Sequence, residues 1–402
     1  MSSRAPVRVL GPLAGFAAGF GEHLGRRGYR PGTVADQLWL VVDVSRWLAQ
    51  RGLGAADLTA VRVEEFSGER RASGRARYSS RALDPLLEYL RGLGVAPVAV
   101  RASPLTPVDA LVERYGAYLV EGRGLSSSTV RHYVGVARVF LSWREATAGT
   151  LSLAGLDSAA VIAFVLGETG RCSVGSAKCL VTRLRAFLRF LRVQGEVDRD
   201  LSGVVPSVAS WRLAGLVKAL DAGSLGRLLA SCDRRTRLGR RDFAVLMLLL
   251  RLGLRAGEVA ALRVSDVDWR SGEVMIRGKG NRRERLPLPA DVGEALAGWL
   301  VRGRPRCECV FVFTRVRAPL DRLSSGGVSA IVQRACRRTG LAVVGSHRLR
   351  HTAATEMLRA GGSLTEVGQV LRHRSRDVTS IYAKVDRSAL AAVVMPWPGA
   401  AA

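Results

Sequence analysis

The chain has 402 residues, 48% of them hydrophobic, so it is long enough for two or three domains with buried cores. Its 61 basic and 34 acidic residues give a net charge of +27, which predicts a polyanionic partner, with nucleic acid as the first candidate. This composition excludes a wholly disordered chain. Because no apolar run reaches about 18 residues, we expect no membrane span.

The positive charge is concentrated in the C-terminal part of the chain. Residues 221–402 carry 32 basic and 16 acidic groups, whereas the surplus is only five in residues 1–100 and six in residues 101–220. Contact with a polyanion is therefore expected to be strongest in the C-terminal part. The six Cys show no framework spacing in a chain too large to need disulfides, which predicts reduced thiols and a cytoplasmic location.

The N-terminal half contains a weak internal repeat, in which Trp47 corresponds to Trp143 at an offset of 96 residues. The offset then drifts to 98 and 101 residues, as small loop insertions would produce. The further matches are Leu58 with Leu156, Phe66 with Phe164, and Tyr89-Leu90-Arg91 with Phe190-Leu191-Arg192. Two units are too few for a solenoid, so the repeat predicts two related helical domains, at residues 1–100 and 105–200.

Apolar residues in the second copy recur at helical spacing. One stripe runs from Val130 to Leu141 behind a capping Ser, and another runs from Leu180 to Leu191. The face opposite the second stripe carries four basic residues: Lys178, Arg183, Arg185 and Arg189. Such a face is either solvated or in contact with DNA phosphates, and the overall charge favours DNA.

From residue 201 the pattern changes. Pro206 and several Gly and Ser predict a linker at residues 201–221, followed by a mixed α/β domain at 222–390 and a C-terminal tail at 391–402. Helices are predicted at Ala222–Cys232, Arg241–Leu252, Ala290–Arg302, Val328–Arg338 and His351–Ala360. Hairpin strands are predicted at Glu273–Arg277 and Arg285–Leu288, around a Gly-Lys-Gly-Asn turn.

Several features of the mixed domain have ordinary explanations when they are taken singly. Arg255 and Glu258 stand three residues apart, as in a plain helical ion pair. Lys279 stands at the tip of the predicted hairpin, where a simple β-turn explains it equally well, and the surrounding sequence does not fit a P-loop. His347 and Arg350 lie on one face of a predicted helix, where a structural His is the usual explanation.

Histidines gather near the C-terminal end of the same domain. His347, His351 and His373 account for three of the five His, and His373 precedes Tyr382 by nine residues. A Tyr is most often a core or interface residue, so the spacing alone assigns it no chemistry. Zinc binding by Cys307 and Cys309 with His347 and His351 is disfavoured, because the Cys-x-Cys spacing is tighter than the common zinc-ligand gap and no second clean pair is present.

Taken together, these residues follow the order Arg…Lys…His-x-x-Arg…His…Tyr, and residues 222–390 resemble the catalytic domain of the tyrosine recombinase (phage integrase) family. The local sequences are similar too: Gly-Leu-Arg-x-x-Glu, Gly-Lys-Gly-Asn, His-x-Leu-Arg-His-Thr, and a His nine residues before the Tyr. The resemblance implies a mainly α fold with a small β-sheet in an α+β catalytic domain. Residues 105–200 look like the family's core-binding domain, and residues 1–100 look like an added, duplicated arm.

The resemblance implies that Tyr382 attacks a DNA phosphate to form a 3′-phosphotyrosine, so that rejoining needs no cofactor, neither ATP nor a metal. Arg255 and Arg350 suit the clamp on the phosphoryl oxygens, because a guanidinium stays charged and can bond two oxygens at once. The other implied roles are Lys279 as general acid for the leaving 5′ oxygen, His347 as acid/base near the Tyr, His373 as donor to the phosphate, Glu258 as orienting residue for Arg255 or His347, and His351 as a supporting or packing residue.

Arg372 departs from the family pattern, because the family usually has Gly before the last His. A bulky cation at this position either alters the local turn or contacts DNA. Two further candidates for DNA contact, Arg282 and Arg283, lie beside the predicted hairpin tip. The apolar segment 388–397 is similar to family tails that dock on a neighbouring protomer, and a helix folded back onto its own domain is the alternative.

The resemblance implies a bacterial, nucleoid-associated recombinase that binds double-stranded DNA at paired sites and assembles as a homotetramer. It would exchange strands through a Holliday junction during integration, excision or transposition. A non-cleaving accessory protein of the same fold is one alternative, and the complete set of cleavage residues argues against it. A type IB topoisomerase-like enzyme, which relaxes supercoils as a monomer, is the other. The doubled N-terminal domain and the apolar tail argue against that alternative.

Overall fold

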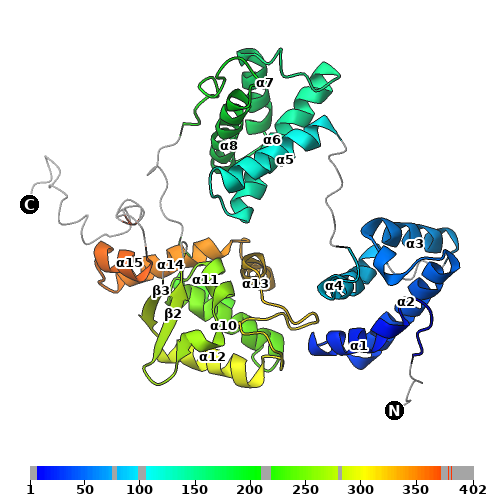
Figure 1. Cartoon of the computed structure of the whole chain (residues 1–402). Coiled ribbons are helices and arrows are strands. Elements are labelled where there is room, and N and C mark those ends of the chain that lie inside the picture. Colours follow the sequence, from blue (N-terminus) through cyan, green and yellow to red (C-terminus); the bar gives the residue numbers. More distant parts are fainter. Residues whose placement is uncertain are drawn as a thin grey trace, which may run out of the picture. The chain divides into compact units, whose positions relative to one another are not determined.

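The computed structural model describes residues 7–74, 79–97, 106–209, 219–278 and 283–372, together with Thr379 and Tyr382 (Figure 1). The described chain is mostly helical and contains one small sheet, which confirms the predicted fold class. The contacts within the chain divide it into two units. The first unit consists of Met1–Val98 together with Gly215–Ala402, and the second unit is Ala99–Ala214. Among the described residues, no helix has the length and apolar character needed to cross a membrane.

The described N-terminal residues of the first unit form four α-helices around their own apolar core. The helices are α1 (Ala17–Arg26), α2 (Pro31–Gln50), α3 (Ala60–Ala72) and α4 (Asp84–Gly92), with short 3-10 turns at Ala14–Phe16, Ala55–Asp57 and Ser80–Leu83. Pro31 starts α2, where a missing N–H costs nothing and the fixed φ suits a helix. Trp47 of α2 packs edge-on against Phe66 of α3, with ring centroids 5.8 Å apart.

Residues 106–209, the described part of the second unit, also form four α-helices: α5 (Pro107–Glu121), α6 (Ser127–Ala148), α7 (Ser158–Thr169) and α8 (Val174–Val193). The predicted Ser cap is present, because the Ser126 hydroxyl accepts from the Thr129 N–H at 3.4 Å. Trp143 of α6 packs against Phe164 of α7, with ring centroids 5.4 Å apart. These two residues are the ones that the repeat matches to Trp47 and Phe66. The two four-helix bundles therefore use corresponding aromatic pairs in their cores.

The remainder of the first unit is the mixed domain. Its helices are α9 (Ala222–Ala230), α10 (Arg237–Arg251), α11 (Ala256–Ala261), α12 (Ala290–Arg302), α13 (Ser325–Arg338), α14 (Ser346–Arg359) and α15 (Leu364–Val370). Its antiparallel sheet has the order β1 (Val267–Asp268), β2 (Glu273–Arg277) and β3 (Arg283–Pro287), and a 3-10 turn at Val264–Asp266 precedes it. In β2 and β3, Val274 pairs with Leu286 and Arg277 with Arg283.

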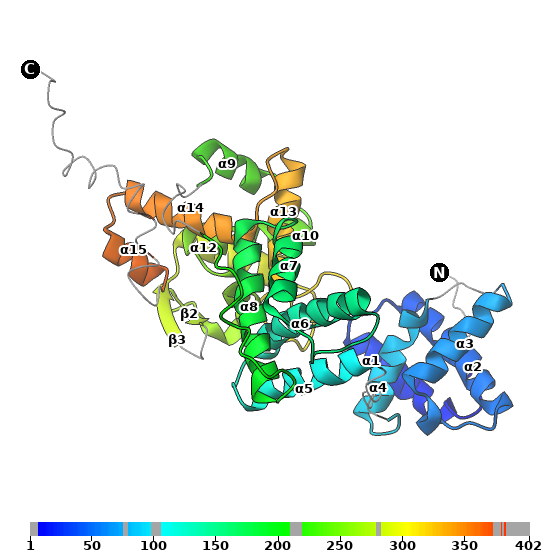
Figure 2. The ribbon, with the colours of Figure 1, turned by 90° about the horizontal axis from the view of Figure 1, so that it is seen from above.

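Helix α10 forms the centre of the mixed domain. Its residues Ala244 to Leu249 are all buried, and it packs against α12, α13 and α14. This apolar stretch covers every side of the helix, so this part of α10 is stable only inside a core. Figures 1 and 2 both show α14 and α15 next to each other at one side of this domain. Arg350 of α14 donates to the carbonyl of Leu371, directly after α15, so the end of α15 lies against α14.

Several predicted ends need correction, and caps explain two of them. Helix α10 begins at Arg237 because the Thr236 hydroxyl accepts from the Gly239 N–H at 3.0 Å. Helix α13 begins at Ser325 because Ser324 caps it in the same way. Helix α14 begins at Ser346 rather than His351, without a capping side chain, which brings His347 and Arg350 into its first turns. The prediction was right to the residue for β2 and α12.

Candidate active site

Helix α14 places three of the predicted residues, His347, Arg350 and His351, within two turns. Residues three and four apart lie on the same face of a helix. The His347 and His351 rings meet edge to face with centroids 4.4 Å apart. His347 is exposed at the surface, yet its pKa lies below the ordinary value. The main cause is partial burial of the ring by surrounding atoms, followed by the positive charges of Arg350 and Arg255.

Arg350 is the most deeply buried cation of the group, with an exposed fraction of 2%. Its two terminal nitrogens donate to the backbone carbonyls of Gly253 and Leu371, so it joins α14 to the segment before α11 and to the end of α15. Gly253 has a φ of +57°, and a Cβ there would lie 2.4 Å from a Leu371 methyl carbon. Burial, and then the charge of Arg255, lower the pKa of Arg350 to about 10.

Arg255 stands at the N-cap of α11, and its guanidinium faces solvent, with 45% of the side chain exposed. Glu258 receives two bonds from it. One carboxylate oxygen accepts from the Arg255 side chain at 2.7 Å, and the other accepts from its backbone N–H at 2.8 Å. Glu258 itself is only 5% exposed. The sequence predicted Glu258 as an orienting residue for either Arg255 or His347, and in the structure it pairs with Arg255.

Arg372 lies at the turn that ends α15 and has a φ of +55°. This left-handed conformation is where Gly is common after a helix, and it costs a residue with a Cβ about 1–2 kcal/mol. The side chain is 5% exposed. It donates at 2.8 Å to the Glu258 oxygen that also accepts from the Arg255 backbone N–H, and it donates to the Val370 carbonyl at 2.9 Å. The departure from the family's Gly thus leaves the turn intact and turns the cation inward.

Tyr382 is also buried, at 1% exposed, in a small cluster with Leu358, Val367 and Leu371. Its hydroxyl lies 2.7 Å from Nδ1 of His351. Burial raises the pKa of Tyr382 to about 12, and burial followed by the charge of His347 lowers the pKa of His351 to about 4. Near pH 7 Tyr382 is therefore protonated and His351 is neutral, and the tautomer of the imidazole decides which of the two donates the hydrogen bond.

The structure thus brings together Arg255, Glu258, Arg350, His347, His351, Arg372 and Tyr382, which come from α11, α14 and the segment after α15. Lys279, Arg282 and His373 lie outside the described residues, as do the 388–397 segment and the 391–402 tail, so those predictions stay untested. The bond between His351 and Tyr382 was missed by sequence reasoning. The clustering of three His in a short stretch was the available signal.

The predicted DNA-contact residues elsewhere have varied environments. On α8, Arg189 is exposed, whereas Lys178, Arg183 and Arg185 are half-buried. Arg185 donates to the Val205 carbonyl at 2.8 Å and to the Ser207 hydroxyl, and Arg189 donates to the Ser202 hydroxyl at 3.3 Å. Two of the four therefore bind the segment that follows α8. Arg283 is exposed at the start of β3.

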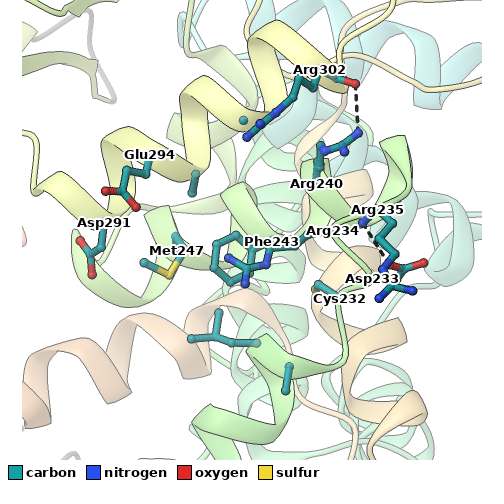
Figure 3. Close-up of a pocket in the computed structure, with 14 residues that line it drawn as sticks. Cys232, Asp233, Arg234, Arg235, Arg240, Phe243, Met247, Asp291, Glu294 and Arg302 are labelled. Carbon is teal, nitrogen blue, oxygen red and sulfur yellow. Dashed lines mark hydrogen bonds between the residues drawn. The ribbon is translucent and has the colours of Figure 1, made fainter.

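A cavity of about 1050 Å³ lies apart from the assembled residues, between α9, α10 and α12 (Figure 3). Figure 3 shows Asp291 and Glu294 toward one end and Arg240 and Arg302 toward the other. None of the predicted site residues lines it. In the described part of the chain, no three His, Cys, Asp or Glu side chains are grouped as metal ligands.

The sequence of the chain matches the phage integrase family over residues 218–388. It is 40% identical to a putative integrase/recombinase, y4rA, of Sinorhizobium fredii, across 97% of this chain and 96% of that protein. It is 28% identical to the tyrosine recombinase XerD of Listeria monocytogenes, across 70% of this chain and 95% of that protein. The chain therefore belongs to the phage integrase family and is a tyrosine site-specific recombinase.

Solved structures agree with this fold. XerH site-specific recombinase, bound to its palindromic difH substrate, aligns with a TM-score of 0.56 at 20% identity, over 69% of this chain and 82% of that one. A λ integrase dimer bound to a core site aligns with a TM-score of 0.54 at 17% identity, over 81% of this chain and 87% of that one. At these identities the alignments establish the fold alone.

Proposed function

We propose that this recombinase cuts and rejoins double-stranded DNA through a 3′-phosphotyrosine on Tyr382, working as a tetramer on paired sites through a Holliday junction. The observation that carries the proposal is the Tyr382–His351 bond beside Arg350 and Arg255. A nucleophile, a base and two phosphate-binding cations are thus gathered from separate segments. The fold neighbours lend support, since one is XerH in a post-cleavage complex and another is a λ integrase tetramer on a Holliday junction.

In the proposed reaction, the Tyr382 oxygen forms a bond to phosphorus while the bond to the 5′ oxygen breaks. The Tyr382 proton passes to Nδ1 of His351, in the tautomer that carries its own proton on Nε2, and the leaving oxygen takes a proton from Lys279. The deoxyribose keeps its link to phosphorus on the 3′ side, so the energy of the phosphodiester is conserved. Rejoining reverses each bond change, with the 5′ hydroxyl of the new strand as nucleophile.

Arg255 and Arg350 have different parts in this proposal. Arg255 is accessible to DNA, and its guanidinium is held by Glu258. Arg350 is anchored by two carbonyls, but a guanidinium has five N–H groups, so these two bonds leave donors for a phosphoryl oxygen. His373 is proposed as a further donor to the phosphate and His347 as a second acid/base. Because Tyr382 is 1% exposed, its hydroxyl must become accessible before DNA can react.

The biological setting is proposed from relatives. Those named integrase/recombinase, together with a transposon integrase among the fold neighbours, favour integration, excision or transposition of a mobile element. The enzyme would then act on nucleoid DNA in a bacterial cytoplasm. The duplicated N-terminal bundle is proposed to add contacts along the DNA, and deleting residues 1–100 without any change in the DNA footprint would contradict that role.

The test is covalent trapping on a nicked suicide duplex. Its sequence is first selected from a randomised duplex pool by the Tyr382→Phe variant, which should bind without cutting. The native chain should then give an SDS-resistant protein–DNA adduct, and Tyr382→Phe should give none. Binding by the native chain without an adduct would instead support a non-cleaving accessory protein. Relaxation of a supercoiled plasmid that lacks the selected sites would support a topoisomerase.

A further inference from the structure

Arg372 occupies a turn that does not require its side chain. Helix α15 ends at Val370, Leu371 caps it, and the Arg372 N–H donates to the Gln369 carbonyl at 2.9 Å. A Gly would make this turn at a φ of +55° without steric cost, whereas a residue with a Cβ is strained there. A strained residue inside a candidate active site is grounds for asking what its side chain does.

The Arg372 side chain closes a ring of bonds with Arg255 and Glu258. It donates to the Glu258 carboxylate at 2.8 Å, and Glu258 accepts from the Arg255 side chain at 2.7 Å. The Arg255 guanidinium in turn reaches the Arg372 carbonyl at 3.5 Å. Arg255 is therefore held from two sides, by the carboxylate and by the backbone of the turn.

The same turn is also bound by Arg350, because the Leu371 carbonyl accepts from its guanidinium. Residues 371 and 372 thus contact both arginines of the proposed phosphate clamp. Arg372 fixes this turn against α11 through Glu258, which lies 114 residues earlier in the chain. Without the Arg372 side chain, this hydrogen bond from the turn to Glu258 would be lost.

Charge explains why Glu258 can be shared. Three guanidiniums and one carboxylate leave an excess of two positive charges among Arg255, Arg350, Arg372 and Glu258. Burial alone would raise the pKa of the Glu258 carboxyl, but the charge of Arg372 and the bonds from Arg255 hold it below its ordinary value. Glu258 therefore stays ionised and orients Arg255 without removing the net positive charge that a phosphate needs. The Nε of Arg372 is buried and lacks a hydrogen-bond partner within the described structure.

We propose that Arg372 is a positioning residue for DNA cleavage: through Glu258 and the 371–372 turn it sets the geometry of Arg255 relative to Arg350. This inference rests on the function proposed above. It replaces direct DNA contact by Arg372, since the side chain is only 5% exposed and paired with Glu258. Misplacing a catalytic group by about 1 Å can lower a rate on the order of 100-fold.

The test compares Arg372→Gly, Arg372→Lys and a control, Arg359→Ala, which removes an exposed Arg that pairs with Glu356 on α14. The readouts are the single-turnover rate of adduct formation on the selected suicide duplex, the Kd for that duplex and the thermal midpoint. Arg372→Gly should slow adduct formation roughly 10- to 100-fold. Its Kd should stay within about twofold, since a buried residue makes no DNA contact. The control should match the native chain in all three.

Rescue separates positioning from folding. Millimolar guanidinium, far below denaturing concentrations, should restore part of the rate of Arg372→Gly by filling the vacated space beside Glu258. Arg372→Lys should form the adduct more slowly than the native chain, because an ammonium is a single point charge. It lacks the planar fork with which Arg372 bonds both Glu258 and the Val370 carbonyl. If the Gly variant does not fold, the Lys variant decides, and a native rate in it would overturn the proposal.

The outcomes distinguish this inference from the proposed function. A native chain that forms no adduct refutes the function, whatever Arg372 does. A native chain that forms the adduct, with Arg372→Gly equally fast, refutes the positioning role and leaves the function standing. A slow Gly variant whose Kd rises in proportion would also overturn the proposal, since that result belongs to a residue that contacts DNA.

Discussion

The helical bundles and the candidate active site treat charge in opposite ways. In the bundles the buried residues are almost all apolar, and ion pairs such as Arg138–Asp109 lie at the surface, with exposed fractions of 51% and 29%. Around α14, by contrast, Arg350 is 2% exposed, and the side chains of Arg372 and Glu258 are each 5% exposed. Burying charge is costly unless it is paired, so we propose that the candidate active site gives up stability for chemistry and that the bundles do not. Substitutions in the two regions should therefore fail in different ways.

The largest expected loss of stability is in the bundle cores. Phe164→Ala removes a side chain that is 1% exposed and packs against Phe140 and Trp143. It should lower the free energy of unfolding by about 3–5 kcal/mol, measured by urea denaturation. Phe66→Ala in the N-terminal bundle should cost a similar amount, since it removes the corresponding ring. A cost below about 1 kcal/mol at both sites would contradict the claim that the apolar cores stabilise the bundles.

Arg350→Ala should act mainly on chemistry. It removes one proposed phosphate donor, which should slow adduct formation on the order of 10²–10³-fold. It also leaves the Gly253 and Leu371 carbonyls without this partner, so some stability is lost together with the rate. The single-turnover rate is measured at a temperature where the variant remains folded. A normal rate in folded protein would remove Arg350 from the phosphate clamp.

His351→Asn should change how stability depends on pH. The folded pKa of about 4 lies below the ordinary value of 6.5, so between these values the unfolded chain binds a proton that the folded chain does not. Stability should therefore fall as pH is lowered from about 6.5 toward 4, and level off above 6.5. Asn can accept the Tyr382 bond but does not titrate. Denaturation at several pH values should give a shallower slope for the variant, and equal slopes would contradict the buried, neutral His351.

The smallest effect is expected at the surface of the second unit. Arg138→Ala breaks a pair with Asp109 that is largely exposed, and such pairs contribute roughly 0–1 kcal/mol. Added salt should reduce even this difference, because it screens exposed charges. Paired denaturation curves at low and high salt measure it. A salt-independent loss of several kcal/mol would contradict the claim that charged pairs contribute little to the stability of the bundles.

The sequence was sufficient for features that depend on local pattern. The bounds of β2 and α12 were right, because alternation and helical spacing are written within a few residues. The order of Arg255, His347, Arg350 and Tyr382 led to the correct family, since each residue type matches one chemical need of phosphoryl transfer. The start of α14 was missed because no capping side chain marks it.

Long-range pairing could not be predicted in the same way. Arg372 bonds Glu258 across 114 residues, and its left-handed turn is invisible in a sequence that has no Gly there. His351 bonds Tyr382 across 31 residues, whereas the sequence alone favoured its neighbour His347 as the group near the Tyr. Both features depend on where α15 returns beside α14, which is a matter of tertiary packing.

The central claim, that Tyr382 is the nucleophile, is tested most directly by locating the covalent bond. The adduct trapped on the selected suicide duplex is digested with nuclease and trypsin, and the peptides are sequenced by mass spectrometry. Cleavage after Arg376 and Lys384 gives a peptide of residues 377–384 that contains one Tyr. We predict that the residual nucleotide is attached to Tyr382 in this peptide. Attachment to any of the other six Tyr, or to a Ser, would contradict the account.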